Sequence, residues 1–240
     1  AALQRQMEGV LGARNIPLRG AKEMQGMSRQ TSNNPSLGHT MMPLENYGSL
    51  MQTIRERFDV IGQLKASHAA DFARAESAAF HGRKIVEGTA FACLVAIENG
   101  LTTIPRDAKG QWNAEDIFKN LKKKGLEVLP SPSVIRPATP DEEKEHGVKT
   151  TIEGLPERRL THDELIAIYQ RLHGWAHELN PYTWVEHDTF YAKHSPALWS
   201  DLERLERFLE RHFISIRGKG FYCTLRDKND GQTKVLPLQK

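Results

Sequence analysis

Cysteine is scarce in this sequence: among 240 residues there are only two, Cys93 and Cys223. They lie far apart, one in an apolar run and one in a strand-like run. Neither has the neighbouring cysteines or histidines of a zinc or redox motif. We therefore expect both to be buried, reduced thiols in a cytoplasmic protein.

Long apolar runs are lacking as well. A helix needs about 20 consecutive apolar residues to cross a bilayer, and no stretch of the sequence provides them. Residues 1–10 do not have the pattern of a signal peptide. We therefore expect no membrane partner and a cytoplasmic location.

Neither sign of charge dominates. The sequence has 33 Lys+Arg and 30 Asp+Glu, which gives a net charge of +3. This balance neither requires nor excludes nucleic acid, because only basic groups clustered on one face would matter. The length allows one large domain or one domain with extensions, and the 39% hydrophobic and 26% charged composition is that of a globular protein.

Helical periodicity is what the sequence does have. Residues 47–99 carry apolar side chains at spacings of three and four, which predicts one long bent helix or two consecutive helices. Asn113 predicts the start of a helix that ends near Lys124. The pattern Thr161-x-x-Glu164 is a capping box and predicts a helix that ends near Leu179, before Pro181.

The later segments are more varied. Residues 129–145 hold four prolines and predict neither helix nor central strand, so residues 126–160 are interpreted as an insertion with one short strand at 148–152. Residues 184–193 predict an aromatic loop, and Ser195-Pro196 predicts the start of a helix with a leucine stripe over 198–209.

The predicted fold is mainly α. An antiparallel helical bundle over residues 49–213 contains the insertion at about 126–160. Residues 1–48 have a loop composition and predict a flexible N-terminal arm. Residues 214–240 predict a small C-terminal β-hairpin that turns at Asn229-Asp230-Gly231.

Residues 171–178 hold several ionisable side chains close together: one guanidinium, two imidazoles and a carboxylate. His173 and His177 are spaced i and i+4, as zinc ligands on a helix would be. However, Gly174 stands where a protease-type zinc motif has glutamate, and no third ligand has a telling spacing. We therefore expect no metal and no other cofactor.

Arg171 and His177 are separated by six helical steps, so on an ideal helix their side chains point about 120° apart. One straight helix does not pair them. A frayed helix end, or two copies of the helix meeting, would bring the two groups together.

The spacing Arg171-x5-His177 late in a helical domain resembles the Arg-x(4–6)-His motif of HEPN (higher eukaryotes and prokaryotes nucleotide-binding) domains. Residues 75–84 resemble an early bundle helix of that family, and residues 179–182 resemble the segment after its histidine. The resemblance covers roughly residues 55–182. Where the family often has a polar residue after the arginine, this chain has Leu172; either His173 supplies the polar group or the site is degenerate.

The resemblance implies an HEPN-like bundle and a metal-independent endoribonuclease, commonly in toxin–antitoxin, phage-defence or RNA-processing systems. Attack by the RNA 2′-hydroxyl needs a proton acceptor, which His177 supplies with His173 nearby. The extra charge on phosphorus needs a fixed cation, which Arg171 supplies. Glu76 or Asp71 on the early helix would orient that arginine.

The resemblance also implies a homodimer whose motifs face each other, with RNA as substrate and an antitoxin or defence-system protein as partner. Asn180 is a supporting residue, and Trp175 and Tyr182 would stack on unpaired bases. Two other interpretations stay open. One is a non-catalytic HEPN-like module that binds a nucleotide, RNA or a partner protein. The other is a helical interaction protein that uses the 198–209 leucine stripe.

Overall fold

The computed structural model describes residues 43–100, 110–126, 128–177, 182 and 186–239. Most of the predicted arm lies outside these residues. Its last part was predicted wrongly, because residues 43–48 are helical and begin α1 (Pro43–Ala66). Pro43 is the first residue of this helix, a position where proline loses no helical hydrogen bond. The fold class is mainly α, as predicted.

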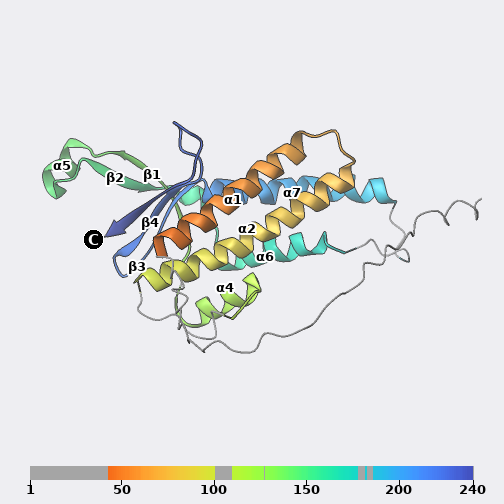
Figure 1. Cartoon of the computed structure of the whole chain (residues 1–240), viewed down its shortest axis with the longest axis horizontal. Helices are drawn as coiled ribbons and strands as arrows, with labels where there is room; N and C mark the ends of the chain where they lie inside the picture. Colours follow the sequence, from red (N-terminus) through yellow and green to blue (C-terminus); the bar gives the residue numbers. More distant parts are fainter. Residues whose placement is uncertain (1–42, 101–109, 127, 178–181, 183–185, 240) are drawn as a thin grey trace, which may run out of the picture. The chain divides into compact units, whose positions relative to one another are not determined.

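Two consecutive helices, rather than one bent helix, follow the arm. The chain turns after α1 and returns as α2 (Asp71–Gly100), which lies at the centre of the helical layer in Figure 1. Small residues of α2 allow close approach to its neighbours: a Cβ added at Gly82 would lie 3.2 Å from Leu172 Cδ1. The central helix therefore contacts α1, α4, α6 and α7.

Two of the three predicted helix starts are confirmed. Asn113 accepts a hydrogen bond from the backbone N–H of Glu115 and begins α4 (Ala114–Lys123). Thr161 and Glu164 form the predicted capping box at the start of α6 (His162–Gly174). The predicted end of α6 near Leu179 is wrong, because the helix ends at Gly174 and the next residues form a turn.

The last helix starts earlier than predicted. Helix α7 (His187–Leu209) includes residues 187–193 of the segment predicted as an aromatic loop and carries Pro196 inside it. An internal proline costs a helix about 3 kcal/mol or more. Here Phe190 and Tyr191 pack on Trp175, and this burial helps to offset that cost.

The leucine stripe of α7 faces the core rather than solvent. Its members are at most 3% exposed: Leu198, Leu202, Leu205 and Leu209. Core packing therefore accounts for the stripe, and it is not a free interaction surface.

The C-terminal β element is larger than predicted. An antiparallel five-stranded sheet has the order β2-β1-β3-β4-β5. Its strands are β1 (Ser131–Pro137), β2 (Thr150–Gly154), β3 (Arg211–Ile216), β4 (Lys219–Thr224) and β5 (Lys234–Gln239). The predicted C-terminal hairpin is the β4–β5 pair, and Gly231 in its turn has φ +69°.

The proline-rich insertion builds one side of this sheet, so the prediction of neither helix nor central strand was wrong. Strand β1 pairs with β2 on one side and with β3 on the other. Helix α5 (Pro140–His146) lies between β1 and β2, and a short 3-10 turn, η1 (Pro156–Arg158), follows β2. The prolines are compatible with these elements because Pro137 ends β1 and Pro140 starts α5.

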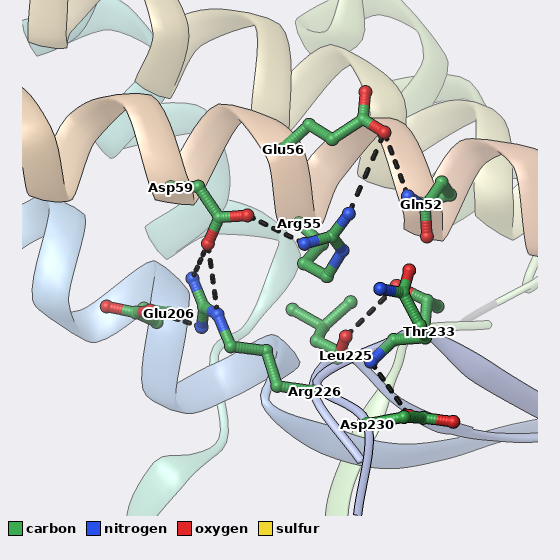
Figure 2. Close-up of polar contacts among 10 residues, drawn as sticks. Gln52, Arg55, Glu56, Asp59, Glu206, Leu225, Arg226, Asp230 and Thr233 are labelled. Atoms are coloured by element: carbon green, nitrogen blue, oxygen red, sulfur yellow. Dashed lines mark hydrogen bonds and ion pairs between the residues drawn. The ribbon is translucent and has the colours of Figure 1, made fainter.

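Side-chain contacts join the helices to the sheet. Arg226, just after β4, donates hydrogen bonds to Asp59 on α1 and Glu206 on α7, as Figure 2 shows. Cys93 and Cys223 are buried free thiols, as expected, and burial raises the pKa of each. Among the described helices, none is long and apolar enough to span a bilayer.

Candidate functional site at the C-terminal end of α6

Arg171 is held by a carboxylate on the neighbouring helix. Its Nε and Nη2 donate hydrogen bonds of 2.7 and 2.8 Å to the two oxygens of Asp201 on α7. The Asp201 side chain is 9% exposed, whereas that of Arg171 is 51% exposed. The hydrogen bond to Asp201 raises the pKa of the guanidinium. Arg171 is therefore a fixed cation that solvent can reach.

A cavity of about 310 Å³ lies beside this ion pair. Aromatic rings form part of its wall: Trp175 from the turn after α6 and Phe190 and His194 from α7. The rings of Trp175 and Phe190 lie 5.8 Å apart, edge to face. Flat apolar faces next to a guanidinium suit a planar polar group that carries negative charge, such as a nucleotide.

The two imidazoles lie on a different side of α6. His173 is in its last turn, and His177 follows the turn that ends the helix. Their Nε2 atoms are 3.4 Å apart, and both side chains are exposed. The i, i+4 spacing brings the two predicted catalytic histidines together, although α6 ends between them at Gly174.

A second arginine, Arg83 on α2, joins this pair. Its Nη1 lies 3.1 Å from His173 Nδ1, and its Nε lies 3.3 Å from the Tyr169 hydroxyl and 3.2 Å from Glu87 Oε1. The guanidinium also lies over the Tyr169 ring, 5.2 Å from its centroid. Lys84 Nζ lies 2.7 Å from Glu87 Oε2, on the far side of the carboxylate.

Arg171 and His177 thus point to different neighbours. Arg171 faces α7 through Asp201, and the histidine pair faces α2 through Arg83. The divergence expected from helical spacing agrees with this arrangement. Within one chain, the arginine linked to the imidazoles is Arg83.

The proposed supporting residues have other partners. Glu76 accepts a hydrogen bond from the Tyr191 hydroxyl, and Asp71 pairs with Arg74. Tyr182 is 94% exposed, and Asn180 lies outside the described residues. The carboxylate that holds Arg171 is instead Asp201 on α7.

Sequence reasoning did not single out Asp201, Arg83 or Glu87. A signal existed for each acid, since Asp201 lies three residues after Leu198 and four before Leu205 of the leucine stripe, and Glu87 lies in an apolar helix. A carboxylate among buried positions requires a partner, so both suggested buried ion pairs. The identities of the partners depend on the tertiary fold.

Neither a family model, nor a curated protein, nor a solved structure matches this chain. In the part of the chain that the structure describes, no three His, Cys, Asp or Glu side chains gather as metal ligands would.

Proposed function

We propose that this protein is a metal-independent endoribonuclease of the HEPN type. The observation that carries the proposal is the exposed pair His173–His177 beside Arg83, at the end of the helix that also carries the fixed cation Arg171. Imidazole exchanges protons near neutral pH, and guanidinium binds phosphate oxygens through a planar fork. Cleavage of RNA by its own 2′-hydroxyl needs both functions.

In the proposed reaction, His177 takes the proton of the 2′-hydroxyl while the 2′-oxygen attacks phosphorus. The bond from phosphorus to the 5′-oxygen breaks, and the imidazolium returns a proton to that oxygen. The products are a 2′,3′-cyclic phosphate and a 5′-hydroxyl end. Arg171 stabilises the additional charge on the phosphorane.

Leu172 has a structural explanation that supports this proposal. It is 2% exposed and packs where α6 meets α2 near Gly82. Its apolar character is required by the bundle core. The next residue, His173, is the polar group of the motif that faces Arg83 and His177.

We also propose a homodimer in which the motifs of two chains share one cleft. The divergence of Arg171 and His177 supports it, because a twofold axis beside α6 would bring the arginine of one chain to the histidine of the other. Mixing inactive Arg171→Ala with inactive His177→Ala protein would then restore one intact centre in each mixed dimer. Cleavage that does not recover on mixing, or a fully active monomer, refutes the shared cleft.

A toxin or phage-defence effector, controlled by an antitoxin or another defence-system protein, is the setting that we propose for such an enzyme. The decisive experiment compares cleavage of a labelled single-stranded RNA in EDTA. Wild-type protein should cut it, and the Arg171→Ala/His177→Ala double variant should not. His146→Ala, at an exposed histidine of α5, is the matched control and should cut normally.

A non-catalytic module that binds nucleotide or RNA is the second candidate. It is favoured by the bidentate pair with Asp201, which already neutralises Arg171, and by the aromatic cavity beside it. Wild-type protein that binds RNA without cutting it would support this candidate over the enzyme.

A further inference from the structure

The hydrogen bond between Arg83 and His173 specifies the position of a proton. A guanidinium has only N–H donors and no acceptor. The His173 Nδ1 atom, 3.1 Å from Arg83 Nη1, must therefore be the acceptor and carry a lone pair. A neutral imidazole with a lone pair on Nδ1 carries its proton on Nε2.

The same reasoning extends to the second imidazole. His173 Nε2 lies 3.4 Å from His177 Nε2, so the proton on His173 points at His177. His177 Nε2 is then the acceptor and keeps its lone pair. That lone pair is engaged by the long 3.4 Å contact with His173, and a substrate hydroxyl that replaces this contact would meet it as a general base. Arg83 thus determines which imidazole donates and which one accepts.

Arg83 is itself held in place by the groups around it. Its Nε contacts Glu87 and the Tyr169 hydroxyl, and its guanidinium lies over the Tyr169 ring. Glu87 is 10% exposed at its side chain and also accepts from Tyr169, at 3.2 Å, and from Lys84. A buried carboxylate costs free energy unless it is paired, and here its partners come from two helices. The guanidinium that donates to His173 is therefore held in a fixed position.

We infer that Arg83 is a positioning residue that fixes the tautomers of His173 and His177, so that His177 keeps its proton on Nδ1 and its lone pair on Nε2. The catalytic part of this inference depends on the proposed ribonuclease function. Both ring nitrogens of His173 are engaged, one by Arg83 and one by His177, so a proton taken from the substrate goes to His177.

Nitrogen NMR tests the tautomers without reference to activity. Two-bond correlation spectra of 15N-histidine-labelled protein distinguish Nδ1–H from Nε2–H rings, and His173→Gln and His177→Gln spectra assign the signals. The wild type should show His173 as Nε2–H and His177 as Nδ1–H. Met cannot donate a hydrogen bond, so Arg83→Met should change the tautomer populations of both rings. Arg83→Lys should largely restore the wild-type populations.

Lys84→Met is the matched control, since Lys84 contacts Glu87 from the far side of the carboxylate. It should leave both tautomers unchanged. A wild-type His173 with its proton on Nδ1, or an unchanged spectrum in Arg83→Met, would overturn the inference. Should Arg83→Met not fold, a Tyr169→Phe variant, which loosens Arg83, should redistribute the tautomers in part; an unchanged spectrum there is equally contrary.

Cleavage kinetics separate this role from phosphate binding. In Arg83→Met, kcat should fall about tenfold with little change in KM, because the ring loses both its tautomer and its orientation. Arg83→Lys should recover most of the rate. A higher KM with unchanged tautomers would make Arg83 a phosphate ligand instead. If the wild type does not cut RNA, the proposed function fails, while the NMR result still decides whether Arg83 fixes the tautomers.

Discussion

Histidine occupies opposite environments at the two ends of the helices. His212, at the end where the helices meet the sheet, is fully buried. Its Nδ1 donates to the Leu209 carbonyl at 2.9 Å, and its Nε2 accepts from the Tyr47 hydroxyl at 2.7 Å. Burial lowers its pKa to about 4. This histidine is neutral, links Tyr47 to Leu209 by hydrogen bonds and cannot be reached by a substrate.

His173 and His177, at the C-terminal end of α6, have a similar number of partners but are exposed to solvent. A fixed tautomer at His212 serves only the fold, because both ring nitrogens are occupied by permanent partners. A fixed tautomer at His173 directs a proton toward an imidazole that a reactant can approach. Access to solvent, rather than hydrogen bonding alone, therefore separates the two proposed catalytic histidines from the structural one.

The largest effect should come from removing the accessible imidazole. We expect His177→Ala to reduce RNA cleavage by about 100- to 10,000-fold, since the reaction loses its proton carrier. Its thermal unfolding should match the wild type, because His177 is exposed. Gel-based cleavage assays in EDTA and thermal unfolding measure the two quantities. Full cleavage by a well-folded His177→Ala protein would show that the exposed histidine is no more catalytic than the buried His212.

The core beneath the site should affect stability rather than cleavage chemistry. Leu172→Ala should lower the free energy of unfolding by about 2–5 kcal/mol, because it leaves a cavity where α6 meets α2. Denaturant titration measures this loss, and Leu236→Ala, at an exposed leucine of β5, is the control. A variant as stable as the wild type would show that Leu172 is not part of the core.

Local signals in the sequence predicted the elements whose ends depend on neighbouring residues. Asn113 and the Thr161–Glu164 box start helices as expected, since a cap involves residues within one turn. Strand β1 was missed because its pairing with β3 joins residues about 80 positions apart. The start of α7 was missed because Ser195-Pro196 has the pattern of a cap, and packing on Trp175 overrides it.

The candidate site divides in the same way. Arg171, His173 and His177 lie on or just after one helix, so their spacing could be read directly from the sequence. Their partners, Asp201 and Arg83, come from α7 and α2. Which carboxylate and which arginine reach α6 depends on how three helices pack. No local pattern contains that information.

The buried His212 should make the free energy of unfolding depend on pH. Between its ordinary pKa of 6.5 and its folded pKa of about 4, His212 binds a proton in the unfolded chain but not in the folded one. Its contribution to the free energy of unfolding is therefore constant above 6.5 and declines as the pH falls toward 4, by about 3 kcal/mol at most. Denaturant titration at several pH values measures the decline.

His212→Gln removes the titrating group and should flatten this part of the pH dependence. The variant will be less stable overall, because Tyr47 and Leu209 lose their shared partner. The comparison between variants therefore concerns the slope rather than the absolute stability. An equal slope in His212→Gln and the wild type would mean that other groups cause the acid sensitivity.

The smallest effect should come from the charged contacts that Arg226 makes with α1 and α7, shown in Figure 2. Arg226→Ala removes hydrogen bonds to Asp59 and Glu206, yet all three side chains are more than a third exposed. Because water and salt screen such pairs, we expect the free energy of unfolding to fall by about 1 kcal/mol or less. RNA cleavage per folded molecule should not change, since the site lies at the other end of the helices.

Arg207→Ala, at an exposed position of α7, is the control and should have no effect on either quantity. The difference between Arg226→Ala and the wild type should shrink in about 1 M salt. A loss of cleavage in folded Arg226→Ala protein would show that the two ends are coupled.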